Sequence, residues 1–130
     1  MYKIIKPSQS LRIMNLVISD DSPVVRVRLS HMIGELKNVN IVGEAEDVQK
    51  SIEIIEELKP DIVILDISMP GGSGLDVLKN IREKFLHTTV IILTNYSFPQ
   101  YRKICMDSGA DYFFDKSNEF DKVVDVLKDL

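Results

Sequence analysis

The chain has 130 residues, a formal net charge of −4, 45% hydrophobic residues and 28% charged residues, which is typical of one globular domain. The negative charge argues against a nucleic-acid-binding surface, because contacts to phosphate need clustered Lys and Arg side chains. Cys105 is the only cysteine, which excludes an intramolecular disulfide and is typical of a reducing compartment, so we expect a cytoplasmic protein. The apolar runs are much shorter than the ~20 residues that cross a bilayer, and we expect no membrane span.

Five short apolar runs alternate with segments of helical periodicity along the chain. The runs that predict buried strands are Leu16–Ile18, Val39–Val42, Ile62–Leu65, Val90–Leu93 and Tyr112–Phe114. The helical segments are 23–36, 48–58, 74–81, 99–108 and 118–127. We expect Ser73 to cap the third helix and Ser117 to cap the last one. Residues 1–12 are expected to form a loose N-terminal extension, which leaves residues 13–130 as the domain.

The strict alternation of strands and helices predicts the class of fold. It indicates an α/β protein whose parallel sheet is covered by helices on both faces and connected by right-handed crossovers. A closed barrel of eight such units would need about 250 residues. We therefore predict a flavodoxin-like (βα)5 doubly wound parallel sheet with strand order 2-1-3-4-5.

Polar or charged side chains follow four of the five predicted strands. Asp20 and Asp21 follow the first strand, Asp66 the third, Thr94 the fourth and Lys116 the fifth. Because parallel strands end at one edge of a sheet, we expect the three carboxylates to converge in the crevice between strands one and three. Two carboxylates about 5 Å apart repel each other by about 3 kcal/mol at an effective dielectric constant near 20. Such a cluster needs a cation, a proton or a lysine.

The residue types at this edge predict phosphoryl chemistry. Hard carboxylate oxygens with room for water suit Mg²⁺, while the Lys116 ammonium and the Thr94 hydroxyl could hold phosphoryl oxygens. In that setting Asp66 could act as a nucleophile and form an aspartyl phosphate. A lone Asp after a strand is more often a turn or cap residue than a nucleophile, so the prediction depends on the whole combination.

The chain resembles the receiver domain of two-component response regulators over residues 13–130. The stretches that carry the resemblance are LVISDDS (16–22), DIVILDISMP (61–70), SGL (73–75), ILT (92–94), GAD (109–111) and FFDK (113–116). The resemblance implies a phosphorelay phosphoprotein, in which Asp66 accepts a phosphoryl group from a sensor histidine kinase or a phosphotransfer protein. Such a domain would catalyse only its own phosphorylation and dephosphorylation, so we expect no enzyme in the usual sense.

The resemblance also implies roles for the surrounding residues. Asp21, Asp66 and the backbone carbonyl of Ser68 would ligate Mg²⁺, with Asp20 acting mainly through a coordinated water molecule. Lys116 would hold a phosphoryl oxygen. Thr94 and Phe113 would carry the conformational switch.

Several residues depart from the family's usual pattern. Ser68 and Tyr96 occupy positions that tune hydrolysis of the aspartyl phosphate, and the bulky Tyr96 predicts slow self-hydrolysis. Ser117 stands where a proline is common. Together with the stretch Leu93–Ser97, Ser117 is similar to receivers of the LuxR-like regulator subfamily.

Four functional classes are open from the sequence. The first is a free-standing receiver that signals by docking to a partner or by competing for phosphoryl groups. The expected surface for a partner or a homodimer is formed by the fourth helix, the fifth strand and the fifth helix. The second is a receiver fragment of a longer DNA-binding transcriptional regulator. A haloacid-dehalogenase-type phosphatase is disfavoured because Ser68 stands where its second Asp would be. A flavin-binding module is disfavoured because the acidic crevice would repel the cofactor's phosphate.

Overall fold

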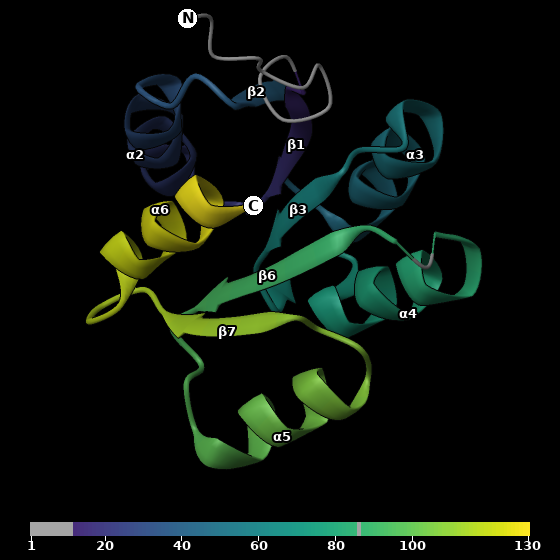
Figure 1. Ribbon diagram of the computed structural model, residues 1–130. Helices are drawn as coiled ribbons and strands as arrows, with labels where there is room; N and C mark the ends of the chain where they lie inside the picture. The colour runs from purple at the N-terminus through teal and green to yellow at the C-terminus, as the bar shows by residue number, and fades with distance from the viewer. Residues whose placement is uncertain (1–11, 86) are drawn as a thin grey trace, which may run out of the picture.

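A five-stranded parallel sheet forms the centre of the protein, for which a computed structural model describes residues 12–85 and 87–130 (Figure 1). The expected N-terminal extension lies outside the described residues except for Arg12. The strands are β1 (Met14–Ser19), β2 (Val39–Ala45), β3 (Ile62–Leu65), β6 (Thr89–Thr94) and β7 (Tyr112–Asp115). Their order, β2-β1-β3-β6-β7, confirms the predicted order 2-1-3-4-5.

Five helices cover the two faces of this sheet. They are α2 (Pro23–Gly34), α3 (Val48–Leu58), α4 (Gly74–Lys84), α5 (Pro99–Asp107) and α6 (Phe120–Asp129). Figure 1 shows α2 and α6 on one face and α3, α4 and α5 on the other. Successive residues of a strand point to opposite faces, so Leu16 and Ile18 pack in the cluster under α2 and α6, while Val17 packs in the other cluster. Both faces of β3 and of the Leu16–Ile18 part of β1 are therefore buried, which is why these stretches are apolar without alternation.

The first turns of two helices are capped by serine side chains. Ser22 Oγ accepts a hydrogen bond of 3.3 Å from the Val25 amide at the start of α2, and Pro23 is the first helical residue. Ser73 caps α4 as predicted, and the Asp76 carboxylate accepts from the Ser73 amide at 3.1 Å to complete a capping box.

The prediction that Ser117 caps the last helix is wrong. Helix α6 begins at Phe120, with Glu119 at the cap position and no capping side chain. The Ser117 amide instead donates to Asp115 Oδ1 at 2.7 Å, and the Asp115 amide donates to Glu119 Oε1 at 3.2 Å. These local bonds form a turn that delays the helix by two residues relative to the prediction, because Asp side chains compete readily for nearby amides.

A small hairpin follows the third strand, in a segment for which the sequence analysis predicted no strand. Strands β4 (Ser68–Met69) and β5 (Gly72–Ser73) pair antiparallel across a turn in which Gly71 has a φ of 87°. The Val48 amide at the start of α3 donates to the Pro70 carbonyl at 3.1 Å and ties the hairpin to that helix. Strands of two residues are too short to give a periodic signal, so the sequence could not indicate them.

Two features bear on the chain's environment and reactivity. No helix in the described part of the chain is long and apolar enough to cross a membrane. Cys105 lies buried on α5, and burial raises the pKa of its thiol to about 11.

We expect the Cys105 thiol to be inert in the folded protein. At about pH 8 a raised pKa leaves almost no thiolate, and burial blocks access by the reagent. Titration with a chromogenic disulfide reagent should give no signal from native protein and one thiol per chain in concentrated guanidinium chloride. Rapid reaction of the native protein would contradict the buried placement.

Candidate functional site

Three carboxylates meet at the carboxyl edge of the sheet. Strands β1 and β3 are neighbours, with Ser19 paired in register with Leu65, so the acids that follow them emerge side by side. One carboxylate oxygen from each of Asp20, Asp21 and Asp66 lies within 4.8 Å of the others. Asp20 and Asp66 are buried at 2% and 5% exposure, whereas Asp21 is exposed. The cluster is therefore half enclosed, with one side open to solvent.

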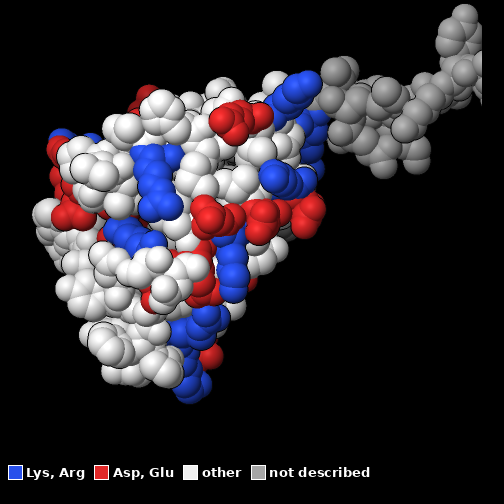
Figure 2. Space-filling view, turned by 90° about the vertical axis from the view of Figure 1, so that its left-hand side faces the viewer, with Lys and Arg blue, Asp and Glu red and all other residues white. Residues whose placement is uncertain are grey.

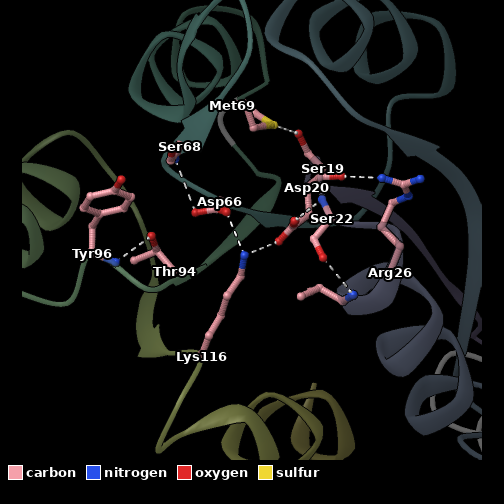
Figure 3. Close-up of polar contacts among 11 residues, drawn as sticks. Ser19, Asp20, Ser22, Arg26, Asp66, Ser68, Met69, Thr94, Tyr96 and Lys116 are labelled. Atoms are coloured by element: carbon pink, nitrogen blue, oxygen red, sulfur yellow. Dashed lines mark hydrogen bonds and ion pairs between the residues drawn. The ribbon is translucent and has the colours of Figure 1, made fainter.

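Lys116 bridges the two buried carboxylates (Figure 3). Its Nζ lies 2.7 Å from Asp20 Oδ2 and 2.7 Å from Asp66 Oδ2, and the side chain is only 8% exposed. The Lys116 amide donates to the Thr94 carbonyl at 3.0 Å, which fixes the start of the β7–α6 turn against β6. The neutralising lysine that the acids require is thus supplied from the far side of β3.

The electrostatic setting explains the protonation of these groups. Burial raises the pKa of Asp20, and the hydrogen bond from Lys116 offsets part of that effect. Burial alone would lower the pKa of Lys116, but the hydrogen bonds and charges of Asp20 and Asp66 outweigh it and raise the pKa above its usual value. The ammonium therefore stays charged at neutral pH and above.

Asp66 is held by backbone contacts on both sides. Its amide donates to the Ser19 carbonyl at 3.0 Å, which extends the pairing of β1 and β3. The Ser68 amide donates to Asp66 Oδ1 at 3.3 Å, so both carboxylate oxygens have partners. Ser68 lies on β4 beside the acids, and its role as a carbonyl ligand stays a prediction.

The two residues predicted to carry the switch, Thr94 and Phe113, are both buried on strands beyond β3. Thr94 is fully buried at the end of β6, on the side of Asp66 away from Asp20, and its Oγ1 accepts from the Tyr96 amide at 3.1 Å (Figure 3). Phe113 is buried on β7, with the Arg102 guanidinium carbon 5.0 Å from its ring centre. In the structure Asp20, Asp21, Asp66 and Lys116 lie together in one cluster, and Phe113 is not part of that cluster.

Tyr96 points away from the acids in this structure. Figure 3 shows its ring turned from Asp66, and the ring packs edge-on against Tyr101 with the centroids 5.9 Å apart. The side chain is 45% exposed. Shielding of Asp66 would require this ring to turn inward, so slow self-hydrolysis stays a prediction.

Arg26 touches the site although the sequence analysis did not identify it. It lies on α2, and its Nη1 donates to the Asp20 carbonyl at 2.8 Å (Figure 3). An arginine in the first turns of a helix is usually a surface residue, and its spacing from Asp20 forms no recognisable motif. Only the packing of α2 against the end of β1 indicates the contact.

The donor set fits a hard divalent cation. Three carboxylates against one ammonium leave a net charge of 1 − 3 = −2 when all four groups are ionised. The exposed Asp21 carboxylate leaves room for water, which Mg²⁺ keeps in its coordination shell.

Figure 2 shows acidic and basic side chains interspersed over the face that carries α2 and α6, with no continuous basic patch there.

Comparisons with known proteins agree with this geometry. The family model of the response regulator receiver domain matches residues 16–128. The uncharacterized transcriptional regulatory protein YhcZ of Bacillus subtilis is 34% identical over 111 residues, which cover 85% of this chain and 52% of the relative. The nitrate/nitrite response regulator protein NarL of Escherichia coli is 31% identical over 112 residues, which cover 86% and 52%. The chain thus spans about half the length of these curated relatives.

Solved structures give the same result. A DNA-binding response regulator of the LuxR family from Staphylococcus aureus has a TM-score of 0.82 at 30% identity, covering 90% of this chain and 98% of that one. The isolated receiver domain of RcsB from Salmonella enterica serovar Typhimurium, solved with the phosphomimetic BeF3⁻, has a TM-score of 0.82 at 28% identity, covering 91% and 90%. The flavodoxin-like fold and the predicted resemblance are confirmed.

Proposed function

Because this chain belongs to the response regulator receiver domain family of two-component systems, we propose that Asp66 is its phosphoacceptor. The phosphoryl donor would be the phosphohistidine of a sensor histidine kinase or a phosphotransfer protein. The observation that carries the proposal is the position of the Asp66 carboxylate, which is buried beside two other acids and 2.7 Å from the Lys116 ammonium.

Asp66, Lys116 and the predicted Mg²⁺ ligands would have separate roles in phosphoryl transfer. A bond forms between a carboxylate oxygen of Asp66 and phosphorus, while the phosphorus–nitrogen bond breaks and its electron pair stays with the donor imidazole. Lys116 moves its hydrogen bond from the carboxylate to a phosphoryl oxygen and stabilises the charge there. Mg²⁺, when held by Asp21, Asp66 and the Ser68 carbonyl with Asp20 nearby, supplies further positive charge to the phosphoryl oxygens.

Thr94 and Phe113 would transmit phosphorylation of Asp66 to the surface of the domain. The Thr94 hydroxyl accepts from the Tyr96 amide and still has its own proton to donate, so it can turn toward a phosphoryl group and move the β6–α5 loop. Phe113 lies one strand further out, on β7, which pairs with β6 in register.

We propose the face made by α5, β7 and α6 as the surface for a partner or a second copy, since Phe98 and Ile104 are exposed there at 58% and 44%.

Phosphorylation of Asp66 can be tested by intact mass. Wild-type protein incubated with Mg²⁺ and a small acyl phosphate should gain one phosphoryl group, and Asp66→Asn should gain none, because an amide is not a nucleophile toward phosphorus. Omitting Mg²⁺ should abolish the adduct.

Asp61→Asn is the matched control for this substitution. Asp61 precedes β3 at the opposite edge of the sheet, where its carboxylate accepts from the Asn15 amide at 2.8 Å, so this variant should be labelled like wild type. An unlabelled wild type, or equal labelling of wild type and Asp66→Asn, would contradict the proposal.

The lifetime of the phosphorylated form tests the role of Tyr96. We expect slow loss of label from isolated phosphoprotein and faster loss from Tyr96→Ala, because the variant has no ring that can turn inward and shield Asp66 from water. The measurement is the decay of the phosphoryl adduct in the presence of Mg²⁺. Rapid decay in wild type, unchanged by the substitution, would exclude shielding.

A receiver fragment of a longer DNA-binding regulator is a second candidate. The chain covers 52% of relatives such as NarL of Escherichia coli, which is consistent with this candidate and does not favour it over a free-standing receiver. A reading frame that continues into a helix-turn-helix segment would support it. The proposed chemistry at Asp66 is the same in both cases.

A further inference from the structure

We propose that Arg26 is a positioning residue for the acid pair, Asp20 and Asp21, and that it acts on the peptide group joining them. The inference rests on the proposed function, because the acid pair supplies the proposed metal ligands. Arg26 would not touch the metal or the phosphoryl group. It would fix the direction in which the Asp21 carboxylate points.

The guanidinium of Arg26 spans three elements. Its Nη1 donates to the Asp20 carbonyl at 2.8 Å, at the end of β1. Its Nε lies 3.4 Å from Oε1 of Glu44, on the edge strand β2, and its own helix is α2. The Arg26 side chain is only 18% exposed and Asp20 is buried, so the contact with the Asp20 carbonyl is shielded from competing water, whereas Glu44 is 43% exposed. The planar guanidinium holds its donors in a rigid fork, whereas the donors of an ammonium rotate freely, so Arg26 fixes the directions of its two contacts.

The remaining contacts of Asp20 fix the first half of the acid pair. Its amide donates to the Ala45 carbonyl at 3.0 Å, its Oδ1 accepts from the Ser22 amide at 2.8 Å, and its Oδ2 accepts from Lys116 at 2.7 Å. With the bond from Arg26 to its carbonyl, every polar group of Asp20 is held. Asp20 is therefore rigid before any metal binds.

Asp21 has no comparable support of its own. Its side chain is exposed, and within residues 12–85 and 87–130 no side chain holds its carboxylate by a hydrogen bond or an ion pair. The direction of this carboxylate depends on its backbone, which begins at the peptide plane whose oxygen Arg26 holds. Loss of Arg26 would also leave a buried carbonyl without its donor, which favours rotation of that plane.

Outer partners of metal ligands usually change metal affinity by ten- to a hundredfold when removed. Arg26→Met keeps the length and apolar stem of the side chain and removes its donors. We expect it to weaken Mg²⁺ binding about tenfold, measured by calorimetric titration of the full chain. We also expect a lower backbone order parameter for the Asp21 amide in metal-free protein, measured by nitrogen-15 relaxation. Arg26→Lys should recover part of the affinity.

Arg28→Met is the matched control for a purely structural role. Arg28 lies on the same helix two residues further on, and its guanidinium carbon lies 3.9 Å from the centre of the Phe120 ring, away from the acid pair. This variant should bind Mg²⁺ within twofold of wild type even where urea unfolding shows a loss of stability. The phosphorylation rate of Arg26→Met should return toward the wild-type rate at saturating Mg²⁺.

The outcomes separate this inference from the proposed function. Wild-type affinity for Mg²⁺ in Arg26→Met, with a wild type that is phosphorylated normally, overturns the inference alone. Equal losses of affinity in Arg26→Met and Arg28→Met also overturn it, because they indicate a general loosening of α2. A wild-type protein that neither binds Mg²⁺ nor accepts a phosphoryl group overturns the proposed function and this inference together.

Discussion

Lys116→Met should accumulate phosphorylated protein at least a hundredfold more slowly than wild type. The substitution removes the ammonium that lies 2.7 Å from Asp66 Oδ2 and keeps a side chain of similar length. Removing one preorganised group that stabilises transition-state charge usually costs about 10²–10³ in rate. The measurement is the initial rate of adduct formation with a small acyl phosphate at saturating Mg²⁺.

The same variant should bind Mg²⁺ more tightly than wild type. Without the ammonium the net charge of the cluster changes from −2 to −3, since three carboxylates then lack a positive partner. A divalent cation is attracted more strongly to that cluster, and no ammonium competes for the oxygens of Asp20 and Asp66. A variant that loses activity and gains metal affinity cannot be explained by unfolding.

Stability should fall in metal-free Lys116→Met. Removing one partner of a buried ion pair typically costs about 3–5 kcal/mol, because the remaining charge is left unpaired. The pKa of Asp20 is already raised by burial, and loss of Lys116 would raise it further. A carboxyl whose folded-state pKa lies above its unfolded value binds more protons when folded, so stability must fall as pH rises through that range. Urea unfolding of the variant should show this fall, and Mg²⁺ should reverse it.

The wild type should also lose stability as pH rises, but only at high pH, where Lys116 loses its proton. The folded-state pKa of Lys116 lies above its ordinary value of 10.5, so its contribution to stability is complete below that value and is lost as pH rises through the folded pKa. Lys122→Met is the control for this pH dependence, because Lys122 is exposed on α6 and, among the residues that the structure describes, forms an ion pair only with Glu119. Equal phosphorylation rates in Lys116→Met and wild type would exclude the proposed role of the lysine.

The order of the strands and the place of the site could be predicted because both depend on simple physics. The residues Ile62–Leu65 are apolar without alternation, which indicates a strand buried on both faces. Once the sheet is parallel, chain connectivity alone places Asp20 and Asp66 at one edge. No knowledge of side-chain conformation is needed for that step.

The contacts within the site could not be predicted in the same way. That Lys116 bridges Asp20 and Asp66, and that Arg26 reaches the Asp20 carbonyl, depends on rotamers and on the packing of helices against the sheet edge. The failed cap at Ser117 has a local cause, since Asp115 takes the Ser117 amide and no pattern in the sequence ranks that bond above a helix cap.

Gly74→Ala should destabilise the protein strongly, by about 3 kcal/mol, which is the upper end of the usual cost of overpacking. A Cβ atom at position 74 would lie 2.0 Å from the Asp66 carbonyl oxygen and 2.9 Å from the Ile67 Cα. These are backbone atoms and cannot rotate away. The Gly74 amide donates to the Ile67 carbonyl at 2.6 Å, so the start of α4 packs closely against the segment that carries Asp66, the proposed phosphoacceptor.

The clash between the added Cβ at position 74 and the Asp66 carbonyl should also slow phosphorylation, because the peptide group of Asp66 must move to relieve it. We therefore expect folded Gly74→Ala to be phosphorylated more slowly than wild type at saturating Mg²⁺, in addition to its lower urea midpoint. Gly34→Ala is the matched control, because Gly34 ends α2 and a Cβ there would meet nothing within 4 Å. That variant should be as stable as wild type or gain up to about 1 kcal/mol, since alanine restricts the unfolded chain. If both variants unfold at the wild-type midpoint, α4 does not approach Asp66 as closely as the structure shows, and the glycine has no part in placing the proposed phosphoacceptor.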